Sequence, residues 1–287
     1  MFFQGDFQNF DIWDAVESGL YYIIIGYYFL IFAYFLIIRF RTSKKLYWLY
    51  FSFLFLFLAA GRFFFIVYYF YAPELLAPVG PLSNIALVEL LMIYYRLATF
   101  STWLGIACLM GVFGILIFPP ITDIEEKSLN NNFKSKIKNL ARKKYNRIIL
   151  KILLIFIPII VGILALCLPD SLFMDPDLND LYLGGTYPLI TIFGYPVGRA
   201  VLNFILLPLM VIFIPIIFIY LALKTFGVLR KSYALNALGF FIYFIGRILQ
   251  GVLDTFQFYH VRAILPPLLI LLSLLIIVIA NNYEQLR

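Results

Sequence analysis

The sequence predicts an all-α fold in which seven transmembrane helices form one bundle, as in a polytopic integral membrane protein. Apolar residues make up 64% of the chain and charged residues only 13%, whereas about 25% charged residues is usual for a soluble protein. Seven apolar runs approach or exceed the roughly 20 residues that a helix needs to cross a bilayer. Basic residues gather in alternate loops, as they do in multi-pass membrane proteins.

The seven predicted spans leave no separate soluble domain, so residues 1–287 form a single transmembrane domain. The third span is too long for one upright crossing and carries Asn84 and Glu89 at its outer end. We therefore expect a long tilted helix whose outer end is shielded by protein. In chain order the spans cover residues 20–38, 46–71, 84–118, 148–168, 198–223, 235–259 and 263–280.

The distribution of charge predicts the orientation of the bundle. Seventeen of the 22 Lys and Arg residues fall in the loops and the terminus on one side, while the loops on the other side are acidic. The positive-inside rule then places the N-terminus outside and the C-terminus in the cytoplasm. The net charge of +7 follows from this topology and does not indicate nucleic-acid binding, which requires a folded basic domain.

The longest cytoplasmic loop, residues 121–147, contains a basic amphipathic segment. Phe133, Ile137 and Leu140 share one helical face and are surrounded by basic side chains, which is typical of a helix on the inner leaflet that binds anionic lipids. Docking of a cytoplasmic signalling partner is the alternative interpretation. The basic residues expected on this lipid or partner surface are Lys136, Arg142, Lys143, Lys144 and Arg147.

The longest outer loop, residues 169–197, is acidic, and long surface loops are usually solvated. Asp175, Asp177 and Asp180 invite comparison with a calcium site, but their spacing does not match a complete EF-hand loop. We therefore expect no metal there. A lid over the mouth of the bundle is the alternative role for this loop.

The first two spans resemble the fifth and sixth. In each pair a short basic turn is followed by an aromatic run and then by a Gly-Arg dipeptide, Gly61-Arg62 in one pair and Gly246-Arg247 in the other. This pattern predicts two parallel three-helix repeats joined by the fourth span as a linker. Chance similarity between apolar segments is the competing explanation. A glycine beside each arginine would permit close helix packing.

Charged side chains inside the predicted spans indicate a polar core. Placing one charge in hydrocarbon costs about 3 kcal/mol, so such groups normally face other helices or water. Arg247, Gln250 and Asp254 share one helical face in the sixth span. Glu89 and Arg96 share a face in the third, but their separation of seven residues, about 10 Å, prevents a direct pair within one helix.

Salt bridges between helices are therefore expected, in two layers. Glu89 and Asp254 would lie nearer the outside, and Arg62, Arg96 and Arg247 deeper. With Arg199 at the outer end of the fifth span, four arginines against two acids leave a positive surplus, which a small anion or a ligand with a carboxylate or phosphate would balance. A closed ion network that locks the bundle is the alternative. The predicted ligand-binding residues are Arg62, Glu89, Arg96, Arg199, Asn203, Arg247, Gln250 and Asp254.

Signatures of known seven-helix families are absent. The seventh span has no interior Lys for a retinal Schiff base, and neither the acid-Arg-Tyr triplet nor the Asn-Pro-x-x-Tyr motif of animal receptors occurs. The Pro-Gln signature of small sugar carriers is also missing. The sequence contains no catalytic motif and no Cys/His metal cluster, so we expect no enzymatic activity, cofactor or metal.

These observations predict a seven-transmembrane receptor-like sensor in the cell membrane. It would bind a small anionic ligand in an outward-facing polar pocket and signal through its basic cytoplasmic loops to a separate partner. Two alternatives come from other classes of protein. One is a small-solute transporter or channel that uses the parallel repeats, and the other is a structural subunit of a membrane complex.

Overall fold

The computed structural model describes residues 11–71, 74, 83–117, 144–176, 178–179, 187–192, 195–256 and 258–283. Seven long helices dominate it. They are α1 (Ile12–Ala33), α3 (Leu46–Ile66), α4 (Asn84–Ile117), α6 (Lys144–Cys167), α9 (Leu207–Lys224), α10 (Gly227–Thr255) and α11 (Tyr259–Asn282). Three π-helical segments continue these helices: η1 (Tyr34–Phe40), η2 (Val67–Tyr71) and η6 (Ala200–Leu206). The other elements are short: α2 (Arg41–Ser43), η5 (Asp170–Leu172), β1 (Thr191–Ile192), β2 (Tyr195–Pro196) and α8 (Val197–Arg199).

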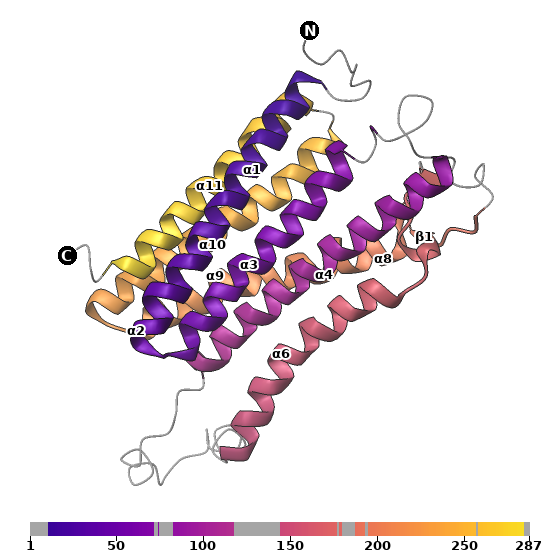
Figure 1. Cartoon of the computed structure of the whole chain (residues 1–287). Coiled ribbons are helices and arrows are strands. Elements are labelled where there is room, and N and C mark those ends of the chain that lie inside the picture. Colours follow the sequence, from indigo (N-terminus) through magenta and orange to yellow (C-terminus); the bar gives the residue numbers. More distant parts are fainter. Residues whose placement is uncertain are drawn as a thin grey trace.

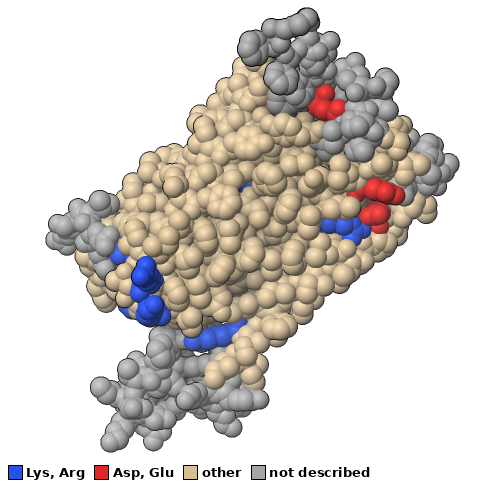
Figure 2. All heavy atoms as spheres, viewed as in Figure 1, with Lys and Arg blue, Asp and Glu red and all other residues tan. Residues whose placement is uncertain are grey.

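The helices have the length and surface of a multi-pass membrane protein. Within the described residues, seven helices are long and apolar enough to cross a membrane, which confirms the predicted number of spans. Figure 2 shows Lys and Arg at one end of the molecule, Asp and Glu near the other end with one basic patch beside them, and a broad, almost uncharged belt between the two ends. Following the predicted orientation, we call the end where α1 begins the outer end and the opposite end the inner end.

Six of the long helices form a ring, and α6 lies outside it. Around the ring α1 contacts α3, α3 contacts α4, α4 contacts α9, α9 contacts α10, α10 contacts α11, and α11 returns to α1. Helix α6 packs against α4 at the edge of the bundle (Figure 1). The inner half of the ring is filled by aromatic side chains. Among them, Phe218 meets Phe113 edge to face at 5.4 Å between centroids and stacks on Phe240 at 5.5 Å.

The ring divides into two sets of three helices, while the internal repeat expected from the sequence stays a prediction. The first half of the ring (α1, α3, α4) and the second half (α9, α10, α11) each pack in chain order, and α6 connects them outside the ring. Each Gly-Arg glycine lies against the third helix of its own half. A methyl group at Gly61 would lie 3.1 Å from the Ala98 carbonyl oxygen, and one at Gly246 would lie 3.3 Å from the Pro266 carbonyl oxygen.

Helix α1 begins at Ile12, well before the predicted start at residue 20. The Asp11 side chain accepts hydrogen bonds from the backbone amides of Trp13 and Asp14, at 2.7 and 2.8 Å, and the Asp14 carboxylate accepts one from the Asp11 amide at 3.1 Å. This capping box satisfies amides that the first turn would otherwise leave unpaired. Hydropathy locates the apolar part of a helix, so the prediction missed a polar first turn.

The outer end of the bundle differs from the sequence-based expectation in two places. Asn84 and Glu89 are exposed in α4, so the predicted protein shield over this end is wrong. Conversely, the start of the 169–197 segment is not a solvated loop. Phe173 and Met174 are each only 1% exposed and pack in an apolar cluster with Tyr95 of α4. The loop is therefore anchored by apolar burial where it leaves α6.

Candidate functional site

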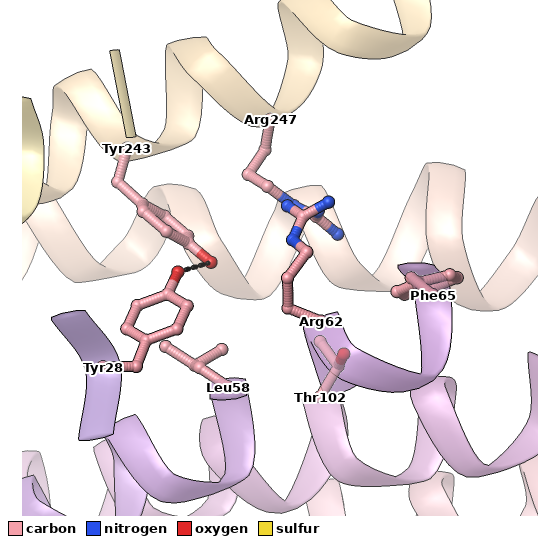
Figure 3. A pocket seen from close by; sticks show the side chains of 7 residues that line it. All are labelled: Tyr28, Leu58, Arg62, Phe65, Thr102, Tyr243 and Arg247. Carbon is pink, nitrogen blue, oxygen red and sulfur yellow. Dashed lines mark hydrogen bonds between the residues drawn. The ribbon is translucent and has the colours of Figure 1, made fainter. Parts of the chain in front are cut away.

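A small cavity lies inside the ring of helices and is lined by two arginines. Its volume is about 20 Å³. Three of the four long helices that line it belong to the first half of the ring, and the fourth, α10, belongs to the second half (Figure 3). The lining residues are Tyr28 of α1, Leu58, Arg62 and Phe65 of α3, Thr102 of α4, and Tyr243 and Arg247 of α10. We call this space the central cavity.

Arg62 and Arg247 direct their guanidinium groups toward each other in the central cavity (Figure 3). Arg62 is only 7% exposed, and its guanidinium carbon lies 4.2 Å from the centroid of the Tyr21 ring. This is a cation–π contact. Within the described part of the chain, neither guanidinium has a carboxylate within ion-pair distance. Two like charges thus share one small space.

Hydroxyl groups complete the polar lining of the central cavity. The Tyr28 hydroxyl donates to the Tyr243 hydroxyl at 3.3 Å (Figure 3), which leaves the Tyr243 proton available for another acceptor. The Thr102 hydroxyl donates to the Ala98 carbonyl at 2.9 Å. None of the described lining side chains is a carboxylate. The lining therefore offers hydrogen-bond donors and positive charge, which is the chemistry of an anion site.

A buried ion pair lies on the outer side of the central cavity. Glu17 of α1 is only 3% exposed, and its carboxylate lies 3.3 Å from the Arg262 guanidinium of α11. Tyr21, one turn after Glu17, lies between this pair and Arg62. The first span predicted from the sequence begins at residue 20, which places Glu17 outside the bundle. The spacing of Glu17, Tyr21 and Tyr28 along one helical face was the signal that could have found it.

Arg96 lies in a second polar group, nearer the outer end, where it caps the C-terminus of α6. It donates to the carbonyl oxygens of Leu166 and Leu168, at 2.6 and 2.5 Å, and to the Asp170 carboxylate at 2.6 Å. A cation is stabilised at a helix C-terminus, where unpaired carbonyls point. Arg96 is therefore used to hold α6 against α4 and does not reach the layer of Arg62 and Arg247 that was expected.

Arg199 joins the same outer group from the second half of the ring. It donates to the Phe173 carbonyl, to Asp175 at 3.2 Å and to the Tyr68 hydroxyl at 3.0 Å, and its guanidinium lies 4.1 Å from the Tyr95 ring centroid. Asn203 donates to the Tyr95 hydroxyl. We call Arg96, Asp170, Asp175, Arg199 and their hydrogen-bond partners the outer cluster.

The predicted ligand-binding residues thus separate into groups. Arg62 and Arg247 line the central cavity, whereas Arg96, Arg199 and Asn203 belong to the outer cluster. Glu89 is exposed on α4, so its predicted place in the polar core is wrong. Gln250 is half-buried on α10 and does not line the cavity, and the Asp254 side chain lies outside the described part.

The predicted lipid or partner surface lies mostly beyond the described part of the chain. Lys136, Arg142 and Lys143 fall outside it, and Lys144 and Arg147 lie in the first turn of α6 without a described side chain. At the outer loop, Asp177 and Asp180 also fall outside, while Asp175 binds Arg199. Among the described residues, no group of three or more His, Cys, Asp or Glu side chains could hold a metal.

Comparison with known proteins assigns neither a family nor a function to this chain. No protein-family model, no curated protein and no solved structure matches this chain. The function must therefore be inferred from the chemistry of the central cavity and of the groups around it.

Proposed function

We propose that this protein binds a small anion in the central cavity and transfers it across the cell membrane as a carrier or channel. The observation that carries the proposal is the convergence of Arg62 and Arg247 on one cavity, without a carboxylate partner among the described residues. Buried charges are ordinarily paired. An anion between these two guanidiniums would supply the missing partner.

Electrostatics support the presence of an anion. Two guanidinium groups that face the same small cavity repel each other, and the repulsion is stronger inside a protein than in water. A monovalent anion between them adds two attractions, each over a shorter distance than the repulsion, so the sum becomes favourable. Glu17 is the buried carboxylate nearest to this region among the described residues, and it already binds Arg262. Glu17 therefore does not neutralise the positive charge of Arg62 and Arg247.

The arrangement of the helices supports transfer. Many carriers consist of two repeats with the substrate at their interface, and the repeats move relative to each other. Here Arg62 belongs to the first half of the ring and Arg247 to the second. The aromatic core closes the inner side of the ring, and the outer cluster ties its halves together through the contact between Arg199 and Tyr68. If the outer cluster and the aromatic core opened in alternation, the anion would enter from one side of the membrane and leave on the other.

A receptor-like sensor is the second candidate, and one observation favours it. The outer segment after α6 is held by Arg96 and Arg199, so a ligand-dependent change in the ring would reach both ends of α6. The basic residues before and within the first turn of α6 would then act on a cytoplasmic partner or on anionic lipids. Binding without transfer of the anion distinguishes the sensor from the carrier.

Reconstitution into liposomes tests the proposal. Chloride efflux from loaded vesicles is measured with a chloride electrode for the unchanged protein, for Arg62→Gln and Arg247→Gln, and for Arg230→Gln, an exposed control at the inner end. We expect efflux with the unchanged chain and the control, and loss of efflux in both cavity variants. Saturable binding without efflux would favour the sensor. Absence of both binding and efflux would contradict the proposal and favour a structural subunit.

A further inference from the structure

We infer that the anion bound between Arg62 and Arg247 is a single-atom halide ion the size of chloride. This inference rests on the proposed function, because it specifies which anion the central cavity accepts. The sequence led us to expect either a small anion or a ligand with a carboxylate or phosphate, and the size of the cavity favours the first of these.

The volume of the cavity limits the ligand to a small ion. It measures about 20 Å³, while a single water needs about 10–15 Å³ on the same measure. Pockets for organic ligands are typically about 300–1,000 Å³. A halide ion, which is slightly larger than a water molecule, fits this space. Acetate, phosphate and sulfate each have four or more heavy atoms and would require the ring to open.

The lining determines the sign of the ion and its hydration. Arg62, Arg247 and the Tyr243 hydroxyl supply donors, and the described lining has no carboxylate that would attract a cation. Leu58 and Phe65 supply the apolar part of the wall, which offers no hydrogen bonds to an ion or to water. An ion in this small cavity must therefore give up part of its hydration shell. That loss is costlier for a smaller ion, so chloride and bromide should bind better than fluoride.

Thermal unfolding of the purified full chain in detergent tests the inference. The melting temperature is measured at constant ionic strength while potassium gluconate is replaced by the fluoride, chloride, bromide, acetate, sulfate or phosphate salt. We expect chloride and bromide to raise the melting temperature in a saturable way, and the other anions to have little effect. The rise should disappear in Arg62→Gln and Arg247→Gln and remain in Arg230→Gln.

Leu58→Ala provides a test that does not remove charge. Leu58 lies one helical turn before Arg62 and lines the cavity, so its truncation enlarges the space and keeps both guanidiniums. We expect this variant to gain stabilisation by acetate while it keeps its response to bromide. A Leu58→Ala chain that responds to acetate no better than the unchanged chain would contradict control by cavity size.

The outcomes separate the two proposals. If acetate or phosphate stabilises the unchanged chain as well as chloride does, and the effect requires Arg62 and Arg247, then the halide inference is wrong and the anion-binding function stands. If every salt acts equally on all variants, the effect is a general salt effect and both proposals are wrong. If no anion of the panel changes the melting temperature, anion binding itself is overturned.

Discussion

The Arg96 guanidinium lies 2.6 Å from the Asp170 carboxylate and at the same time donates to carbonyl oxygens at the C-terminal end of α6. This single side chain joins α4 to the one long helix that stands outside the ring. The contact adds to the packing of α6 along α4, which holds a helix whose surface is otherwise largely exposed. It also explains why Arg96 is absent from the central cavity.

Replacement of Arg96 should loosen α6. Arg96→Met removes the donors to the α6 carbonyls, and hydrogen bonds from a charged donor contribute about 1.5–3 kcal/mol, so we expect a loss of about 2–3 kcal/mol in unfolding free energy. Asp170→Asn is the matched variant. The Asp170 side chain is 44% exposed, and an exposed ion pair contributes only about 0–1 kcal/mol. We therefore expect Asp170→Asn to lose no more than about 1 kcal/mol in unfolding free energy. Denaturant titration of both variants in detergent would test this, and equal losses would contradict the capping role.

Replacement of Arg247 should affect stability in a salt-dependent way. If Arg62 and Arg247 repel each other when no halide is present, Arg247→Gln in gluconate should be at least as stable as the unchanged chain. In chloride the order should reverse, because only the unchanged chain gains from the anion. The measurement is the melting temperature in the two salts. Strong destabilisation in both would indicate instead that the arginines form part of a structural network.

The Glu17 carboxylate and the Arg262 guanidinium should be energetically coupled. Removal of one partner of a buried pair leaves an uncompensated charge and typically costs about 3–5 kcal/mol; we expect about 3 kcal/mol for Glu17→Gln, because Arg262 is 24% exposed. The double variant Glu17→Gln with Arg262→Gln should recover part of that loss. A double-mutant cycle measures the coupling, and additive losses would show that the pair contributes nothing of its own.

Replacement of a glycine in the Gly-Arg dipeptides by alanine should destabilise the bundle. Gly61→Ala places a methyl group 3.1 Å from the Ala98 carbonyl oxygen, so α3 and α4 must separate, and overpacking of this kind costs about 1–3 kcal/mol. Gly246→Ala should cost less, because its nearest atoms lie at 3.3 Å. Gly26→Ala is the control, since nothing lies within 4 Å of a methyl group there. Thermal unfolding should show a loss at Gly61 and no loss at Gly26.

The basic segment before α6 should bind anionic lipids. Each Lys near a negatively charged surface contributes about 1 kcal/mol, so Lys143→Gln with Lys144→Gln should weaken binding of a peptide covering residues 121–147 to phosphatidylserine vesicles by about 2 kcal/mol. Vesicles of phosphatidylcholine alone are the control surface. Unchanged affinity for the anionic vesicles would contradict the lipid role and leave a protein partner as the alternative.

Much of the fold was predictable, because membrane spans depend on local properties of the chain. The seven spans follow from length and hydropathy alone, and the segregation of charge follows from the loops. Helix ends were less predictable. The capping of α1 by Asp11 lies in a polar turn that hydropathy does not mark, and α10 likewise begins at Gly227, well before its predicted apolar start at residue 235.

The candidate site was predictable only in part. The repeated Gly-Arg dipeptide pointed to Arg62 and Arg247, and both line the central cavity. Glu89 looked equally suitable in the sequence, because it shares a helical face with Arg96. The structure instead leaves Glu89 exposed and gives Arg96 a partner, Asp170, from a segment that looked like solvated loop.

By itself, the sequence determined that the chain forms seven membrane-length helices, with basic loops on one side and charged residues inside the spans. These properties depend on neighbours in the chain, and composition and spacing reveal them. Only the tertiary structure decided which charges meet. Helix rotation and packing order bring Arg62 to Arg247 and Glu17 to Arg262, because each pair joins helices from different halves of the ring. No local pattern specifies how two helices turn toward each other.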